Sequence, residues 1–252
     1  MDNLNERSRS PIFPCKVCHH DSHLYGVVDF NKNCEESKGF YLPLSGVPIY
    51  YHQCSHCGLV FTAAFDHWSK EDFGRYIYND GYGQVDPEYS DKRPRENADL
   101  VSRFCGQRTS LKVLDYGGGN GALARHMNAK GFDAQSWDPM QENAVHHRPV
   151  HAQYDVVTAF EVMEHSPTPV ETLADGTSFL KEQGVFLFST WTIDDLPPRS
   201  SNFHYFAPRN GHVTVHTRKS LTILAARCRL KVHHFGPGQH LIYGSLPSWL
   251  PR

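Results

Sequence analysis

The sequence predicts an α/β fold, with a doubly wound parallel sheet preceded by a small cysteine-rich module. Three observations predict this arrangement. Two C-x-x-C pairs lie near the N-terminus, at residues 15–18 and 54–57. From residue 111 onward, short apolar runs alternate with amphipathic segments, as in parallel strands joined by crossover helices. A glycine-rich stretch at 117–121 follows the first apolar run, where folds of this class bind nucleotide-like ligands.

The composition indicates a folded chain with a small-molecule partner. Of its 252 residues, 39% are hydrophobic and 21% are charged, which is typical of globular proteins. The formal net charge of −2 disfavours nucleic acid, because neutralising a phosphate backbone usually requires a basic surplus. We find no apolar run of membrane-spanning length and no signal peptide, so we expect a cytoplasmic protein without membrane contact.

Changes in composition divide the chain into four segments. We expect residues 1–12 to form a polar, flexible tail. Residues 13–64 contain both cysteine pairs and few long apolar runs. Residues 65–108 are rich in aromatic and charged residues, and we expect a helical connecting or lid segment interrupted at Pro87 and Pro94. Residues 109–252 carry the α/β pattern.

Each element of the last segment follows from its residue pattern. Gly131 ends the first helix because glycine accepts a left-handed backbone, and Thr217 is suited to cap the last helix. We expect a terminal hairpin at 230–245, which places one antiparallel strand in the sheet. The expected strands are 111–115, 132–137, 154–160 and 185–190, and the expected helices are 121–130, 169–180 and 219–228.

The paired cysteines predict a structural zinc site in a zinc-ribbon-like module. Thiolates at this spacing are typical of metal ligands in a reducing compartment. Four thiolates complete a tetrahedral Zn²⁺ site with no open position, which stabilises a small module rather than catalysing a reaction. Neither pair lies between a strand and a helix, which argues against a redox role. The predicted ligands are Cys15, Cys18, Cys54 and Cys57.

The glycine turn has the form D-x-G-x-G-x-G, with Asp115 at its start and Gly121 at its end. Glycines allow a sharp turn and the close approach of a ligand to the backbone. A P-loop is excluded because no Lys–Ser/Thr pair follows the glycines. The dinucleotide interpretation would place a pyrophosphate at the N-terminus of the following helix.

Two acidic residues discriminate between the remaining candidate ligands of this turn. Asp115 is poorly placed beside a pyrophosphate, but it is well placed near a cationic ligand. Asp138 ends the next strand, 21 residues after Gly117, and can accept hydrogen bonds from both hydroxyls of a ribose. Together they predict a ligand with a ribose, a positive centre and no phosphate. S-adenosylmethionine is such a ligand.

The chain resembles class I S-adenosylmethionine-dependent methyltransferases over about residues 100–245. The resemblance is carried by VLDYGGGNG at 113–121, WDP at 137–139 and YDVVTAFEVMEH at 154–165. The cysteine pairs also resemble the zinc-binding domain of some bacterial methyltransferases, including sugar methyltransferases. The resemblance implies a Rossmann-like fold, transferase activity, S-adenosylmethionine as cofactor and a methyltransferase domain at 109–252.

The resemblance also implies roles around the cofactor. The turn lines the methionyl part, Asp138 holds the ribose, and the residues after the strand at 154 lie beside the cofactor. Tyr82 either closes over the methionyl group or packs as an ordinary core residue. Only about 15 residues separate Asp138 from that strand, so we expect the usual third strand to be short or missing. The predicted cofactor-binding residues are Asp115, Gly117, Gly118, Gly119, Gly121, Asp138, Phe160, Glu161 and Tyr82.

The acceptor side requires a group that aligns the nucleophile and removes its proton. Such a group should lie beyond the carboxyl ends of the strands. His165 and His212 are the preferred bases, because imidazole titrates near neutral pH. Glu164 either orients His165 or caps the turn that follows it. No cluster of acids predicts a catalytic cation.

These observations favour a methyltransferase acting on an oxygen or carbon atom of a sugar or secondary metabolite. An RNA or protein methyltransferase that docks its substrate on the zinc module is the main alternative. A noncatalytic binding protein on the same scaffold is a further alternative, which the two intact acids weigh against. Asp115 also disfavours a nicotinamide-dependent oxidoreductase.

Overall fold

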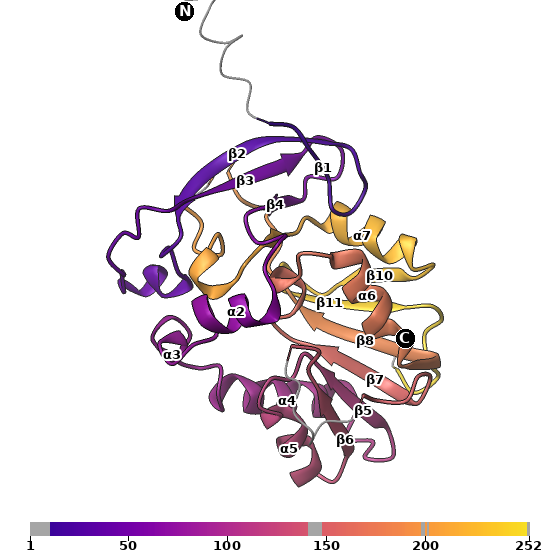
Figure 1. Ribbon diagram of the computed structural model, residues 1–252. Coiled ribbons are helices and arrows are strands. Elements are labelled where there is room, and N and C mark those ends of the chain that lie inside the picture. The colour runs from indigo at the N-terminus through magenta and orange to yellow at the C-terminus, as the bar shows by residue number, and fades with distance from the viewer. Residues whose placement is uncertain (1–10, 141–147, 198–199, 201, 251–252) are drawn as a thin grey trace, which may run out of the picture.

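The computed structural model describes residues 11–140, 148–197, 200 and 202–250. It contains two sheets, one built mainly from the N-terminal residues and one from the α/β pattern (Figure 1). The larger sheet has the order β10-β11-β8-β7-β5-β6. Its strands are β5 (Lys112–Tyr116), β6 (Asp133–Trp137), β7 (Tyr154–Ala159), β8 (Leu180–Ser189), β10 (Lys231–His234) and β11 (Gln239–Tyr243).

The larger sheet is parallel except for one strand. β5 pairs in parallel with β6 and β7, and β7 pairs in parallel with β8. β11 runs antiparallel to both β8 and β10. The hairpin predicted at the end of the chain is therefore confirmed, and it adds the single antiparallel strand among the described residues of this sheet.

Helices cover both faces of the larger sheet, as in a doubly wound fold (Figure 1). Successive residues of β5 show the alternation: Val113 packs in one core with α4 and α5, whereas Leu114 packs in another with α6 and α7. Apolar side chains on both faces explain the short continuous apolar runs within the central strands β7 and β8. The helices are α4 (Lys92–Phe104), α5 (Ala122–Ala129), α6 (Pro169–Ser178) and α7 (Arg218–Arg227).

The smaller sheet is antiparallel and has the order β1-β2-β3-β4-β9. Its last strand, β9 (Thr214–Val215), comes from a segment about 150 residues beyond the others and pairs with Val60 and Phe61. Residues 13–64 therefore do not complete this sheet by themselves. The other strands are β1 (Phe13–Pro14), β2 (Asp21–Asp29), β3 (Pro48–Cys54) and β4 (Val60–Thr62), with a 3₁₀ helix, η1 (Cys34–Lys38), between β2 and β3.

Residues 65–108 form three helices, as expected: α2 (Lys70–Tyr76), α3 (Tyr82–Val85) and α4. Ser69 caps α2 by accepting a hydrogen bond from the Asp72 amide, and the Asp72 carboxylate accepts one from the Ser69 amide. Pro94 does not interrupt the segment, contrary to the prediction, because it lies in the first turn of α4. A missing N–H is tolerated in the first turn because no helical partner exists for it there.

Two boundaries differ from the predicted ones. α6 ends at Ser178, and β8 begins at Leu180 instead of residue 185. The early part of β8 consists of exposed polar residues, so its pattern did not indicate a strand, but Leu180 pairs with Tyr154 before a bulge. On the other side, β6 is the edge strand among the described residues, and residues 141–147 lie outside them. None of the described helices has both the length and the apolar character needed to cross a membrane.

Candidate active site

The glycine turn connects β5 to α5 at the carboxyl edge of the larger sheet. Gly117, Gly119 and Gly121 all have left-handed backbones, with φ of 72°, 53° and 73°. Gly118 is required for a different reason: a Cβ there would lie 2.1 Å from Ser136 Oγ. The turn therefore needs glycine both for its backbone conformation and for its close packing.

Asp115 lies beneath this turn. Its side chain is 3% exposed, and it accepts hydrogen bonds from Ser136 Oγ at 3.4 Å and Thr158 Oγ1 at 3.3 Å. Burial raises the pKa of Asp115 to about 7, despite the hydrogen bond from Thr158. The carboxyl group thus supports the turn from below, and its contact with a ligand stays a prediction.

Asp138 follows β6 and faces the same turn. Its Oδ2 accepts a hydrogen bond from the Gly119 amide at 3.0 Å, and its Oδ1 accepts one from the Met140 amide at 2.8 Å. The side chain is only partly buried, so its remaining lone pairs can reach a ligand. The structure therefore brings the turn and the second acid together, across the ends of two neighbouring parallel strands.

Phe160 and Glu161 follow β7 at the same edge. Glu161 has a left-handed backbone, with φ of 55°, and Ser189 Oγ donates a hydrogen bond to its carboxylate at 2.9 Å. Burial raises the pKa of Glu161, which the positive charge of Arg93 opposes. A strained backbone at a strand end is typical of positions where a side chain is aimed at a functional site.

Tyr82 lies in the helical segment beside this edge. Its side chain is buried, and its hydroxyl lies 3.5 Å from Asp86 Oδ2. Asp86 in turn forms a bidentate ion pair with Arg93, at 3.0 and 2.5 Å. The sequence prediction missed this pair, for which the only signal was opposite charges seven residues apart. A hydrogen bond from Asn120 to the Ser90 carbonyl joins the segment to the glycine turn.

The three predicted acceptor-side residues converge in space. Glu164 and His165 lie in η2 (Met163–His165), directly after β7, whereas His212 comes from the segment after η3 (Pro208–Asn210). One ligand atom from each residue lies within 4.8 Å of the others. The two imidazole rings are 4.9 Å apart at their centroids and nearly perpendicular.

Each of these side chains has a hydrogen-bond partner outside the cluster, and Tyr205 serves two of them. Tyr205 donates a short hydrogen bond to Glu164 Oε1. The two roles predicted for this carboxylate, orienting His165 or capping the next turn, stay predictions. His212 Nδ1 is 2.8 Å from the Tyr205 carbonyl. His165 Nδ1 is 3.2 Å from both the Gly211 carbonyl and the Tyr78 hydroxyl. Burial lowers the pKa of His165 to about 4, so the ring is neutral at neutral pH.

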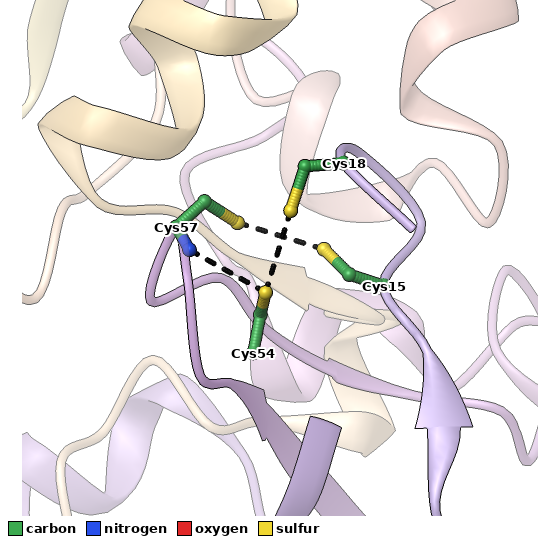
Figure 2. Close-up of side chains that lie close together, drawn as sticks. All are labelled: Cys15, Cys18, Cys54 and Cys57. Atoms are coloured by element: carbon green, nitrogen blue, oxygen red, sulfur yellow. Dashed lines mark hydrogen bonds between the residues drawn. The ribbon is translucent and has the colours of Figure 1, made fainter. Parts of the chain in front are cut away.

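The four paired cysteines form a second candidate site, built from the turns that follow β1 and β3. Their sulfur atoms point toward a common centre, as Figure 2 shows, with Cys15 and Cys57 at 3.5 Å and Cys18 and Cys54 at 3.4 Å. Thiolates bound to a tetrahedral Zn²⁺ at about 2.3 Å would lie about 3.8 Å apart. The amides of Val17 and Cys57 each approach a sulfur at 3.4 Å.

The cysteine cluster is joined to the α/β part by packing and by a hydrogen bond. Cys15, Cys54 and Cys57 share a core with Leu221 and Leu224 of α7. The hydroxyl of Thr217, which caps α7 as predicted, donates to the Cys57 carbonyl. The cluster therefore lies against the N-terminus of a helix that belongs to the larger domain.

Comparison with known proteins identifies the fold. The chain matches curated ubiquinone biosynthesis O-methyltransferases of Yersinia enterocolitica (32% identity over 114 residues; 36% of this chain and 47% of the relative) and Salmonella enteritidis (34% over 112 residues; 36% and 46%). The match thus spans about half the length of these relatives.

Solved methyltransferase structures share the fold at low sequence identity. An O-methyltransferase family protein from Burkholderia thailandensis superposes with a TM-score of 0.52 at 18% identity, covering 72% of this chain and 64% of that one. Mitomycin 7-O-methyltransferase gives a TM-score of 0.51 at 15% identity, covering 68% and 59%. A family model described as a methyltransferase domain matches residues 89–234, which is more than half of the chain. The chain therefore belongs to the methyltransferase family that this domain defines.

Proposed function

We propose that the protein is an S-adenosylmethionine-dependent methyltransferase that modifies a small molecule. The observation that carries this proposal is the juxtaposition of Asp138 with the Gly119 amide, at the carboxyl ends of β5 and β6. Class I folds bind ligands at this edge of the sheet. The match to the methyltransferase family over residues 89–234 covers all three sequence stretches that carry the proposed cofactor site.

The cofactor would lie across the glycine turn. S-adenosylmethionine supplies an electrophilic methyl group on a sulfonium sulfur. Asp138 would accept hydrogen bonds from the ribose hydroxyls, and the backbone of the turn would line the methionyl part. Glu161, held by Ser189, would lie beside the cofactor with Phe160, and Tyr82 would close the site from the helical segment. Asp115 would hold the shape of the turn.

The cluster of Glu164, His165 and His212 would handle the proton of the acceptor. A neutral imidazole can take the proton of a hydroxyl as the oxygen attacks the methyl carbon and the carbon–sulfur bond breaks. In both rings Nδ1 faces a carbonyl, which leaves Nε2 to accept that proton. Oxygen is the favoured acceptor atom because the curated relatives are named O-methyltransferases, and a sugar carbon is the alternative.

We also propose that the four paired cysteines hold a structural Zn²⁺. All four side chains supply sulfur, and a Cys₄ set leaves no position open for substrate. Residues 13–64 would then form a zinc-binding module, 65–108 a lid over the cofactor and 109–252 the methyltransferase domain. This division is supported by the three helices that lie between β4 and β5 along the chain. The module nevertheless takes its last strand, β9, from the final segment.

Two measurements test the proposed function. Calorimetric titration of the purified protein with S-adenosylmethionine and with S-adenosylhomocysteine should show binding of one molecule per chain. Incubation with cofactor carrying an isotopically labelled methyl group and a panel of sugars, phenols and quinols should transfer the label to one class of acceptor. Absence of binding of either cofactor form would reject the proposal.

A further inference from the structure

Glu164, His165 and His212 share one feature that a general-base role does not require. The residues are two imidazoles and one carboxylate, and one atom from each lies within 4.8 Å of the others. Glu164 and His165 are adjacent in η2, but His212 arrives from a segment more than 40 residues later. Two nitrogen ligands and one oxygen ligand on one side of a centre are the set with which proteins bind divalent first-row metal ions.

The partners behind the three side chains fit the same interpretation. Metal-binding histidines usually donate the N–H of the ring nitrogen that does not bind the ion to a carbonyl or carboxylate, which fixes the ring and its tautomer. His165 Nδ1 lies 3.2 Å from the Gly211 carbonyl, and His212 Nδ1 lies 2.8 Å from the Tyr205 carbonyl. Both arrangements leave Nε2 as the nitrogen available for an ion.

Glu164 provides an independent observation. Its side chain is fully buried, Oε1 is held by the Tyr205 hydroxyl, and Oε2 is buried without a hydrogen-bond partner within the described part of the chain. Buried carboxylate oxygens are normally paired, because an unpaired one loses its hydration without compensation. An unpaired carboxylate oxygen on a residue that clusters with two imidazoles is what a cation would satisfy.

We propose that Glu164, His165 and His212 form a binding site for a divalent first-row metal ion on the acceptor side of the active site. Three protein ligands leave open positions for an acceptor oxygen. This proposal rests on the proposed function only for the identity of that acceptor. With the ion bound, both Nε2 atoms would be ligands and no longer bases. The acceptor hydroxyl would then release its proton to water instead of to an imidazole, and the oxygen would attack the methyl carbon while the carbon–sulfur bond breaks.

The test is metal stoichiometry of the tag-free full chain. Protein freed of metal and reconstituted with Co²⁺ should bind two ions, one with the charge-transfer absorption of thiolate ligands and one with weaker visible bands of nitrogen and oxygen ligands. Glu164→Gln and His212→Gln should each lose the second ion and keep the first, whereas Cys54→Ser should lose the first. His204→Gln is the matched control, because this histidine lies in the same segment outside the cluster.

A milder variant guards against misfolding. Tyr205→Phe keeps the ring and removes only the hydroxyl that orients Glu164. It should therefore lower the affinity for the second ion about tenfold or more. Binding of S-adenosylhomocysteine, measured on every variant, reports whether the cofactor site is folded. Absence of the nitrogen- and oxygen-type bands in the wild-type chain, or bands of that type that persist in both Glu164→Gln and His212→Gln, would overturn the metal site. If the wild-type chain does not bind S-adenosylhomocysteine, the proposed function is rejected instead.

Discussion

Gly118 lies directly over the carboxyl group of Asp115. A Cβ at residue 118 would be 2.2 Å from Asp115 Oδ2 and 2.1 Å from Ser136 Oγ, and both of those side chains are buried. The first acid and the glycine turn are therefore one packed unit.

Gly118→Ala should destabilise the protein by about 1–3 kcal/mol, because overpacking a buried contact forces neighbours to move. The free energy of unfolding, measured with urea, checks this. Gly74→Ala is the control: it lies in α2 with no atom within 4 Å of the new Cβ, and it should be neutral or slightly stabilising. Adding Ser136→Ala to Gly118→Ala should recover part of the loss, and no recovery would show that the clash lies elsewhere.

Asp115 should make stability fall as the pH rises. Its pKa is raised to about 7 in the folded chain, mainly by burial, whereas an unfolded aspartate titrates near about 4. The folded state therefore holds a proton that the unfolded state has released, so the free energy of unfolding decreases from about pH 4 to pH 7 and then levels off. Asp115→Asn removes this titration and should gain stability relative to wild type over that range. Parallel pH curves for the two proteins would contradict the assignment.

Asp138→Ala should weaken binding of S-adenosylhomocysteine by about 10- to 100-fold, because a hydrogen bond to a charged group contributes about 1.5–3 kcal/mol. Calorimetry measures the affinity, and circular dichroism checks that the chain still folds. Asp133→Ala is a suitable comparison, because Asp133 starts the same strand, is exposed and pairs only with the exposed Lys112 among the ion pairs described. Equal affinities for both variants would remove Asp138 from the ribose site.

Cys54→Ser should lose bound zinc and lower the unfolding temperature, because a Cys₄ ion contributes to folding directly. Its effect on cofactor affinity should be smaller, since the cysteines pack against α7 and not against α5, the helix that follows the glycine turn. Elemental analysis and thermal unfolding provide the measurements, and Cys228→Ser, a half-buried thiol outside the cluster, should retain the metal. A zinc-loaded variant with normal stability and impaired methyl transfer would show that the cysteines have a different role.

The sequence was sufficient where local chemistry determines the structure. The periodicity from residue 111 onward, Gly131 and Thr217 predicted the larger sheet, its crossover helices and its terminal hairpin, because each depends on neighbouring residues. The positions of Asp138 and of the glycine turn followed from the rule that parallel strands end at one edge. The spacing of the cysteines likewise predicted a cluster that the structure contains.

Contacts between distant segments were not predictable in this way. Nothing in residues 205–217 indicates that Tyr205 reaches Glu164, or that His212 meets His165, because these contacts depend on how a long segment returns over the sheet edge. The Asp86–Arg93 pair was missed since surface-like charges gave no sign of burial against the active site. The position of Asp115 under Gly118 also required the three-dimensional arrangement, because the motif alone is equally compatible with a ligand contact.

The strand β9 has a practical consequence for engineering this protein. It completes the N-terminal sheet by pairing with β4, and the Tyr51 hydroxyl of β3 donates to the His212 carbonyl just before it. A chimaera that exchanges residues 13–64 alone would therefore pair the imported β4 with the host's β9, and it would replace the tyrosine that donates to the His212 carbonyl. To transfer the acceptor preference of a relative to this protein, residues 205–217 would have to be exchanged together with residues 13–64.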